Sequence, residues 1–447
     1  MEESKPLFSA AALRRLLIPS VLEQLLVVTV GVADTVMVSS VGEAAVSALS
    51  LVDAINIMLF QLFVALCTGG AVVISQYLGR KDLHSARRAS GQLVYFIMAV
   101  TLTVTALVLL FARPLLKGMF GRVEPDVMSN ALVYFRLTAL SYPFFSLFTA
   151  GSVIYRCLGN SKVSLYISLF MNLFNISGNA LLIYGFGMGV AGAATATLVS
   201  RILGAGIMVF LIQKKSCPLH IDRIWRVRFR WKYIQKILHI SLPNGAEVGL
   251  FQAGKLVVQS LISTFGTSAI AANAIVNAAA GFLYAPGLSF GLGLVTVVGR
   301  CMGAGEVRQA ERYTKRIVGV TFLVLGGLNL ALFLGSNGIA SLFQIGEAAQ
   351  KTAAELLRWF ALGNGLLWTL AFTTPNALRA SGDVKFTMFI ALFSMTLFRI
   401  GTGYLLGVGF GMGVYGVWLA MYVDWFFRAI VFTRRFYKGK WKTFKAI

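Results

Sequence analysis

Long apolar stretches alternate with short polar ones along the whole chain, and twelve of them stand out. They cover approximately residues 15–39, 46–72, 91–112, 131–152, 163–185, 189–212, 238–262, 270–295, 316–337, 355–376, 386–406 and 412–433. About 20 residues of α-helix span about 30 Å, the thickness of a bilayer core. Strands of a membrane barrel would show alternating positions over about ten residues, whereas these runs are continuous. The pattern predicts an all-α polytopic membrane protein with twelve transmembrane helices.

Composition and charge agree with this prediction. Of the 447 residues, 57% are hydrophobic and 13% charged, and the net charge is +23. With the N-terminus inside, roughly 30 of the 40 basic residues fall in one set of loops, which is the positive-inside pattern. We therefore expect a protein of the cytoplasmic (plasma) membrane with both termini in the cytoplasm. The basic stripe at 223–236 indicates topology and attraction to anionic lipid rather than nucleic-acid binding.

The second half of the chain repeats the first at an offset of 224 residues. The word GFGMGV occurs at 185–190 and at 409–414, and Pro19 and Glu23 correspond to Pro243 and Glu247. RCLGNSK at 156–162 matches RASGDVK at 379–385 with a shift of one residue. The repeat predicts two homologous six-helix lobes, 1–212 and 238–447, joined by a basic cytoplasmic linker at 213–237. Because six is even, the repeat is parallel, with a pseudo-twofold axis along the membrane normal.

This organisation favours a secondary transporter over other classes. Two lobes around a central cleft suit alternating access. The chain has no P-loop for ATP and no TVGYG-like filter of a potassium channel. It also has no constellation of residues for catalysis in the membrane, so we expect neither an enzyme nor a cofactor beyond a coupling ion. The expected partners are small-molecule substrates and membrane lipids, and the protein is expected to act as a monomer.

Polar residues inside the apolar runs are the candidate coupling site. Asp34 lies eleven residues after Glu23, on the same face of the first helix and about 16 Å from it. Asn175 and Asn179 belong to a polar stripe on the fifth helix, and Thr197 follows GFGMGV on the sixth. Asp34, Asn175, Asn179 and Thr197 offer hard oxygen ligands for Na⁺, or Asp34 holds a proton. The alternative is that the asparagines and threonine only form hydrogen bonds between helices.

Other buried charges are candidates for a substrate cleft. Glu23 and Glu247 are equivalent in the repeat, and two carboxylates at a cleft would favour cationic, amphipathic compounds. Lys255 indicates charge compensation or an anionic group on the cargo. Asp53 in the second helix corresponds to Asn277. Structural pairing is the competing interpretation for Glu247 and Lys255. For Arg201, Arg399, Asp424 and Arg428 we favour pairs within a lobe or anchors at the cytoplasmic end.

Several segments resemble the multidrug and toxic compound extrusion (MATE) family. They are GVADTVMVSSVGEAAVSALSL, GGAVVISQYLGRKDLHSA and NLFNISGNALLIYGFGMGVAGAATAT in the first half, and ISTFGTSAIAANAI, VGRCMGAGEVRQA and ALRASGDVKF in the second. The resemblance implies a V-shaped pair of six-helix lobes that exports compounds in exchange for Na⁺ or H⁺. The runner-up function is a flippase for lipids or lipid-linked oligosaccharides, from the same broader superfamily.

The resemblance also bears on individual residues. In many prokaryotic members, the site in the first lobe has an aspartate, an asparagine, a threonine and a second aspartate. Asp34, Asn175 and Thr197 resemble the first three, whereas Asn179 stands where the second acid is expected. Other members place acids in the seventh and tenth helices. Here the tenth helix offers Asn364 but no central acid.

Overall fold

The computed structural model describes residues 6–121, 124–221, 229–343, 346–444 and 446–447, and within these ranges it contains helices and no strand. The helices of the first half are α1 (Ala10–Ser39), α2 (Glu43–Gly79), α3 (Leu83–Phe120), α4 (Pro125–Leu140), α5 (Tyr142–Cys157), α6 (Lys162–Asn179), η1 (Ala180–Gly185) and α7 (Gly189–Gln213). Those that follow are α8 (Trp231–Ser263), α9 (Thr267–Gly303), α10 (Val307–Ser341), α11 (Glu347–Gly363), η2 (Asn364–Thr373), α12 (Thr374–Ser381), α13 (Val384–Ser394), η3 (Met395–Gly401), α14 (Thr402–Tyr404), η4 (Leu405–Gly409), α15 (Gly413–Tyr437) and η5 (Lys440–Thr443). Here η1 to η4 are π-helical turns and η5 is a 3-10 helix.

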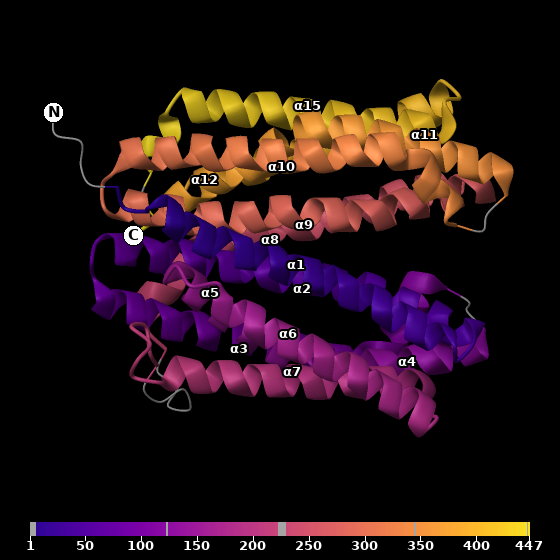
Figure 1. Ribbon diagram of the computed structural model, residues 1–447, viewed down its shortest axis with the longest axis horizontal. Helices are drawn as coiled ribbons and strands as arrows, with labels where there is room; N and C mark the ends of the chain where they lie inside the picture. Colours follow the sequence, from indigo (N-terminus) through magenta and orange to yellow (C-terminus); the bar gives the residue numbers. More distant parts are fainter. Residues whose placement is uncertain (1–5, 122–123, 222–228, 344–345, 445) are drawn as a thin grey trace. The chain divides into compact units, whose positions relative to one another are not determined.

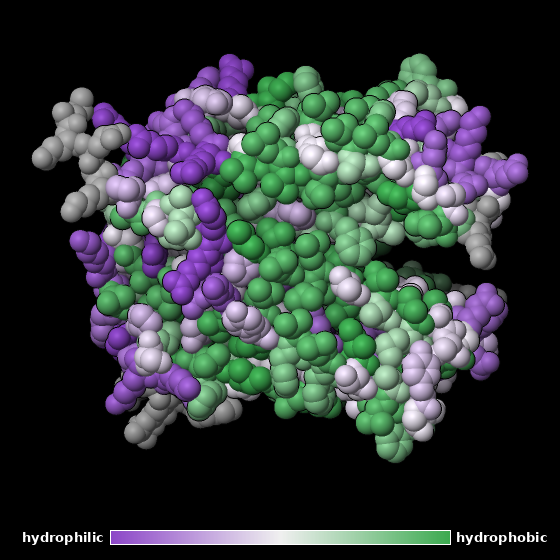
Figure 2. Space-filling view, viewed as in Figure 1, coloured by the Kyte–Doolittle hydropathy of each residue, from purple (hydrophilic) through white to green (hydrophobic). Residues whose placement is uncertain are grey.

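Each of the twelve predicted runs coincides with a helix or with a chain of continuous helical pieces. The fourth run is bent by 42° between α4 and α5, at Ser141. Within the described ranges, nine helices are long and apolar enough to cross a membrane, or ten if this bent pair is one span. On the face shown in Figure 2, hydrophobic side chains cover the middle of the helices and hydrophilic ones gather near both helix ends. The predicted all-α polytopic fold is confirmed.

The chain divides into two compact units. The N-terminal unit is Ser9–Ser241, and the C-terminal unit is Leu242–Ile447 together with the residues before Ser9. Within each unit the long helices run nearly along one direction (Figure 1). The backbone N–H groups of Leu7 and Phe8 donate to the side chains of Gln309 and Tyr313 on α10, at 2.9 and 3.0 Å, so the start of the chain packs on the C-terminal unit.

The two GFGMGV words form the same turn in both units. Gly187 and Gly189 have φ of 64° and 54°, and Gly411 and Gly413 have 69° and 56°. Glycine adopts these left-handed conformations without the steric cost of a side chain, which allows the chain to reverse there. The backbone N–H of residue 188 donates to the carbonyl of residue 182 at 2.9 Å, and residue 412 to residue 406 at 3.1 Å.

The helix before the second GFGMGV word contains one extra residue. RCLGNSK and RASGDVK are 223 residues apart, whereas the two GFGMGV words are 224 apart. Both units have a π-helical turn directly before the motif, η1 and η4, and the helix that precedes the second copy contains a further one, η3. A π-helical turn accommodates one additional residue within a helix, so η3 accounts for the extra residue.

Candidate functional site

The predicted coupling residues form one hydrogen-bonded chain in the N-terminal unit. The Nδ2 atom of Asn179 donates to Oδ1 of Asp34 at 2.5 Å, and it lies 3.4 Å from Oδ1 of Asn175. The Nδ2 atom of Asn175 donates in turn to Oγ1 of Thr197 at 3.1 Å. Asn175 and Asn179 are buried, whereas Asp34 and Thr197 are partly exposed. The structure therefore brings all four residues together.

Three helices position this chain of side chains. α1 packs against α6, and α6 packs against α7, so Asp34, the two asparagines and Thr197 come from neighbouring helices. Asn175 and Asn179 are four residues apart on α6 and share one helix face. The turn at GFGMGV returns the chain so that α7 runs beside α6, and this brings Thr197 back to Asn175.

Asn179 has an unused acceptor beside Asp34. Its side chain is fully buried, and its Oδ1 atom has no hydrogen-bond partner among the described residues. If Asp34 is protonated, an amide flip of Asn179 would let this oxygen accept the carboxyl proton. The pair therefore offers a hydrogen bond to the carboxylate in one amide orientation and to the carboxylic acid in the other.

A second polar group surrounds Asp53, and it lies close enough to Asp34 for their charges to interact. Oδ1 of Asp53 accepts hydrogen bonds from Asn56 Nδ2 and from the Tyr134 hydroxyl, both at 3.3 Å. Arg201 on α7 interacts electrostatically with both aspartates. Its Nη1 donates to the Ser141 hydroxyl at 2.6 Å. Asp53 is predicted as a residue of the substrate cleft, and in the structure it lies near Asp34 and Arg201.

Asn56 and Tyr134 are not among the residues predicted for this site from the sequence. Arg201 offered a signal, because a charged side chain in the middle of an apolar run requires a partner in the membrane. Asn56 gave a weaker signal, three residues after Asp53 and on the same helix face. Tyr134 lies on α4 and gave none, because sequence spacing does not relate residues on separate helices.

Glu23 and Glu247 each form an ion pair within their own unit. Oε2 of Glu23 lies 3.7 Å from Nη2 of Arg156, and Oε1 of Glu247 lies 2.5 Å from Nη2 of Arg379. All four side chains are buried or nearly so. Arg156 and Arg379 open the matching words RCLGNSK and RASGDVK, so the repeat conserves the pair and not only the acid. Because an arginine neutralises each carboxylate, the two glutamates do not by themselves favour a cationic cargo.

Lys255 and Asn364 lie in the C-terminal unit. Lys255 is exposed and has no ion pair with any described residue, Glu247 included. Asn364 is fully buried, and its Nδ2 donates to Oδ1 of Asn329 on α10 at 3.1 Å. The role of Glu23, Glu247, Lys255 and Asp53 as lining of a substrate cleft stays a prediction.

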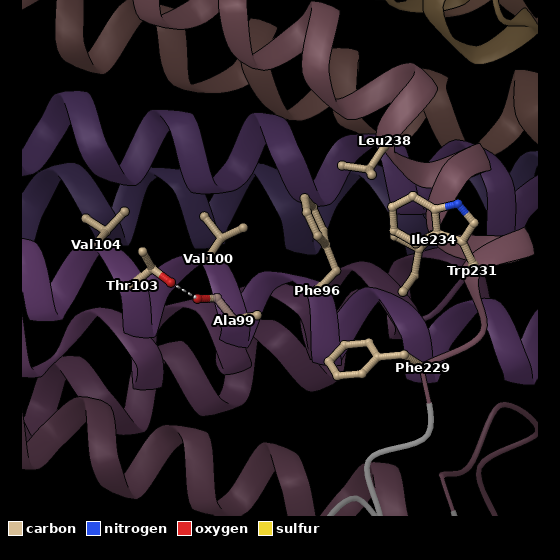
Figure 3. A pocket seen from close by; sticks show the side chains of 9 residues that line it. All are labelled: Phe96, Ala99, Val100, Thr103, Val104, Phe229, Trp231, Ile234 and Leu238. Atoms are coloured by element: carbon tan, nitrogen blue, oxygen red, sulfur yellow. Dashed lines mark hydrogen bonds between the residues drawn. The ribbon is translucent and has the colours of Figure 1, made fainter.

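A groove of about 510 Å³ lies elsewhere in the N-terminal unit, between α3 and the beginning of α8. Its lining is almost wholly apolar, with Phe96 and Val100 on α3 opposite Trp231, Ile234 and Leu238 (Figure 3). None of the predicted site residues lines it. This groove is distinct from the polar site around Asp34.

Comparisons with known proteins agree with the fold and the repeat. The MatE family profile matches residues 19–181 and 243–405, two segments offset by 224 residues. The chain is 25% identical to the "Uncharacterized transporter YisQ" of Bacillus subtilis (strain 168), over 98% of this chain and 96% of that protein. It is also 25% identical to the "Probable multidrug resistance protein NorM" of Thermotoga maritima, over 96% and 92%.

Solved structures show the same fold. The structure titled "Crystal structure of MATE in the bent conformation" superposes with a TM-score of 0.88 at 19% identity, over 96% of both chains. Another, titled "Reverse polarity of binding pocket suggests different function of a MOP superfamily transporter from Pyrococcus furiosus", gives 0.89 at 20% identity over 97% of this chain and 96% of that one. With the family profile matching both halves in register, this chain belongs to the MatE family of multi-pass membrane transporters.

Proposed function

We propose that this protein is a secondary antiporter that exports amphipathic organic compounds across the cytoplasmic membrane, with both termini inside the cell. The proposal rests on the hydrogen bonds that link Asp34, Asn179, Asn175 and Thr197 in this order. Asp34 is the one ionisable side chain of these four, and it lies between membrane helices. A carboxylate inside a membrane is energetically costly, and its presence there therefore indicates a functional role.

We further propose that the coupling ion is H⁺, with Na⁺ as the alternative. The atom of Asn179 that faces Asp34 is assigned as the amide nitrogen, a hydrogen-bond donor that would repel a cation in that place. A Na⁺ ion would need several oxygens turned toward it, so both asparagine amides would have to reorient. A proton needs only the flip of Asn179, whose oxygen is without a partner in the described part of the chain.

The proposed cargo is amphipathic, cationic compounds included. Asp34 and Asp53 face a single arginine, Arg201, which leaves one negative charge in excess in that polar group. Glu23 and Glu247 add no net charge, because Arg156 and Arg379 neutralise them.

Transport into proteoliposomes under imposed gradients tests the proposal. We expect accumulation of a cationic dye to follow a pH gradient and to be lost in Asp34→Asn, which keeps the shape of the side chain. Thr195→Val is a matched control, because the Thr195 hydroxyl donates to the Ala191 carbonyl of its own helix at 2.7 Å. Accumulation driven by a Na⁺ gradient alone would contradict proton coupling. Unchanged transport in Asp34→Asn would overturn the coupling site.

A further inference from the structure

Three cationic side chains lie near one another on three helices of the C-terminal unit. Arg399 in η3 and Arg428 on α15 both pair with one acid, Asp424, and the charge of Lys255 on α8 interacts with that of Arg399. Asp424 is fully buried, Arg428 is 2% exposed and Arg399 is 9% exposed. Two arginines therefore share one acid, and Lys255 adds a further positive charge beside Arg399, a distribution opposite in sign to that around Asp34.

Asp424 forms an ion pair with Arg428 on the same helix. Nε of Arg428 donates to Oδ1 of Asp424 at 2.7 Å, and the Ser394 hydroxyl donates to the same oxygen. The Nη2 atom of Arg428 is satisfied by the Ala391 carbonyl at 2.9 Å. These contacts use Oδ1 of Asp424 and leave its Oδ2 without a hydrogen-bond partner among the described residues.

Arg399 has N–H groups that donate no hydrogen bond within the described residues. Its Nη1 lies 3.5 Å from Oδ2 of Asp424, and neither its Nε nor its Nη1 has a hydrogen-bond partner among the described residues. Its guanidinium carbon lies 5.5 Å from the centre of the Phe251 ring. A guanidinium that is nearly buried with free N–H groups is suited to bind a planar anion in bidentate fashion.

Lys255 lies beside Arg399 because α8 and η3 touch. A Cβ atom added to Gly254 would come within 2.3 Å of Cε of Met395, so the two helices are in close contact there. Lys255 follows Gly254, and Arg399 is one turn beyond Met395. The charges of Lys255 and Arg399 repel each other, and Lys255 has no acidic partner within the described ranges.

The internal repeat relates this group to the Asp34 site. At an offset of 224, Arg399 corresponds to Asn175, and Lys255 corresponds to Gly31, one turn before Asp34. The same pair of helices thus carries the acid and its asparagines in the N-terminal unit and two cations in the C-terminal unit. The extra residue taken up by η3 lies in the same turn as Arg399.

We propose that Lys255 and Arg399 form an anion-binding site that takes a carboxylate, sulfonate or phosphate group of an amphipathic ligand, with Phe251 beside its apolar part. Lys255 has no ion pair with a described residue, and Arg399 shares Asp424 with Arg428, so positive charge is in excess here within a membrane-spanning bundle. Such an excess is costly, and a bound anion would offset that cost. That the ligand is the exported cargo rests on the proposed function; binding itself does not. Cargo would then include zwitterions and organic anions.

Fluorescence titration of the purified protein in nanodiscs, without any gradient, tests the site. The probes are dansylglycine, neutral dansylamide and N-(2-aminoethyl)dansylamide, which share one ring system and differ in charge. The unaltered protein is expected to bind dansylglycine roughly tenfold more tightly than dansylamide. Lys255→Gln and Arg399→Gln are expected to remove this preference, and Lys255→Glu to shift it toward the amine.

Two controls separate this site from the coupling site and from general charge. Lys351→Gln removes an exposed lysine of the same unit, and Asp34→Asn disables the proposed coupling; both are expected to keep the preference. A loss of gradient-driven transport in Asp34→Asn with dansylglycine binding intact supports both proposals. If Lys255→Gln is folded, as judged by its melting temperature, and keeps the tenfold preference, the anion site is refuted. The same holds if the unaltered protein shows no preference.

Discussion

The ion pair of Glu247 with Arg379 provides a quantitative test of whether the repeated acids are structural. The two side chains are 10% and 11% exposed, and the Oε1–Nη2 distance is 2.5 Å. Replacing Glu247 with Gln leaves the Arg379 charge buried without its counterion, which typically costs about 3–5 kcal/mol of unfolding free energy. Arg379 keeps one hydrogen bond to Oδ1 of Asn376 at 3.0 Å, so we expect the lower end, about 3 kcal/mol.

A double-mutant cycle isolates the pair. Because Glu247→Gln with Arg379→Gln leaves no unpaired charge, we expect the double variant to be less destabilised than the sum of the single ones by about 2 kcal/mol. Unfolding in mixed micelles, titrated with SDS and followed by tryptophan fluorescence, gives the four free energies. Additive effects within about 0.5 kcal/mol would refute the pairing. A stable Glu247→Gln variant that loses only dye binding would assign Glu247 to the cargo instead.

Three further predictions follow from other contacts. Gly416→Ala is expected to destabilise the protein by about 1–3 kcal/mol, and more than Gly192→Ala. The reason is that an added Cβ would approach backbone atoms of residues 406 and 407 at 2.7 Å in the first case and of residue 182 at 3.1 Å in the second; SDS unfolding of both variants checks this. Asp82 caps α3 by accepting from Ser85 N at 2.9 Å, and these hydrogen bonds lower the pKa of its carboxyl group. Asp82→Ala is therefore expected to lower the free energy of unfolding by about 1 kcal/mol near neutral pH. Below a pH of about 4 the Asp82 carboxylate becomes protonated, so the difference from the unaltered protein is expected to shrink and to vanish below the lowered pKa. Melting temperatures of both proteins across this pH range check this. Asn179→Asp is expected to add a second titrating group, seen as a second step in the pH dependence of dye transport; a single step would contradict the contact with Asp34.

The fold could be predicted from the sequence because lipid permits few solutions. Continuous apolar runs of about 20 residues force helices, and the offset of 224 residues, anchored by GFGMGV, placed equivalent residues in two halves. The turn geometry at Gly187 and Gly411 followed from the same word. The π-helical turns could not be predicted from hydropathy, although the one-residue shift between the repeats marks the helix where η3 lies.

The grouping of the polar residues was predictable only along single helices. Asn175 and Asn179 share a face of α6, and the short turn after α6 accounts for Thr197, so these contacts follow from spacing. The contact of Asp53 with Tyr134 depends on how α2 and α4 pack, which sequence spacing does not determine. For the same reason spacing did not identify the arginine partners of Glu23 and Glu247. These partners, Arg156 and Arg379, are the first residues of the matching motifs RCLGNSK and RASGDVK.

The most direct test of the central claim is the number of protons exchanged when cargo binds. A cationic dye that the protein transports in proteoliposomes is added to the purified protein in a weakly buffered detergent solution. A pH indicator then measures the protons that are released. Antiport through Asp34 predicts a release that approaches one proton per bound dye at a pH where Asp34 is protonated, and no release in Asp34→Asn even though the dye still binds. Equal release from both proteins, or none from the unaltered protein at any pH, would contradict the assignment of Asp34 as the coupling group.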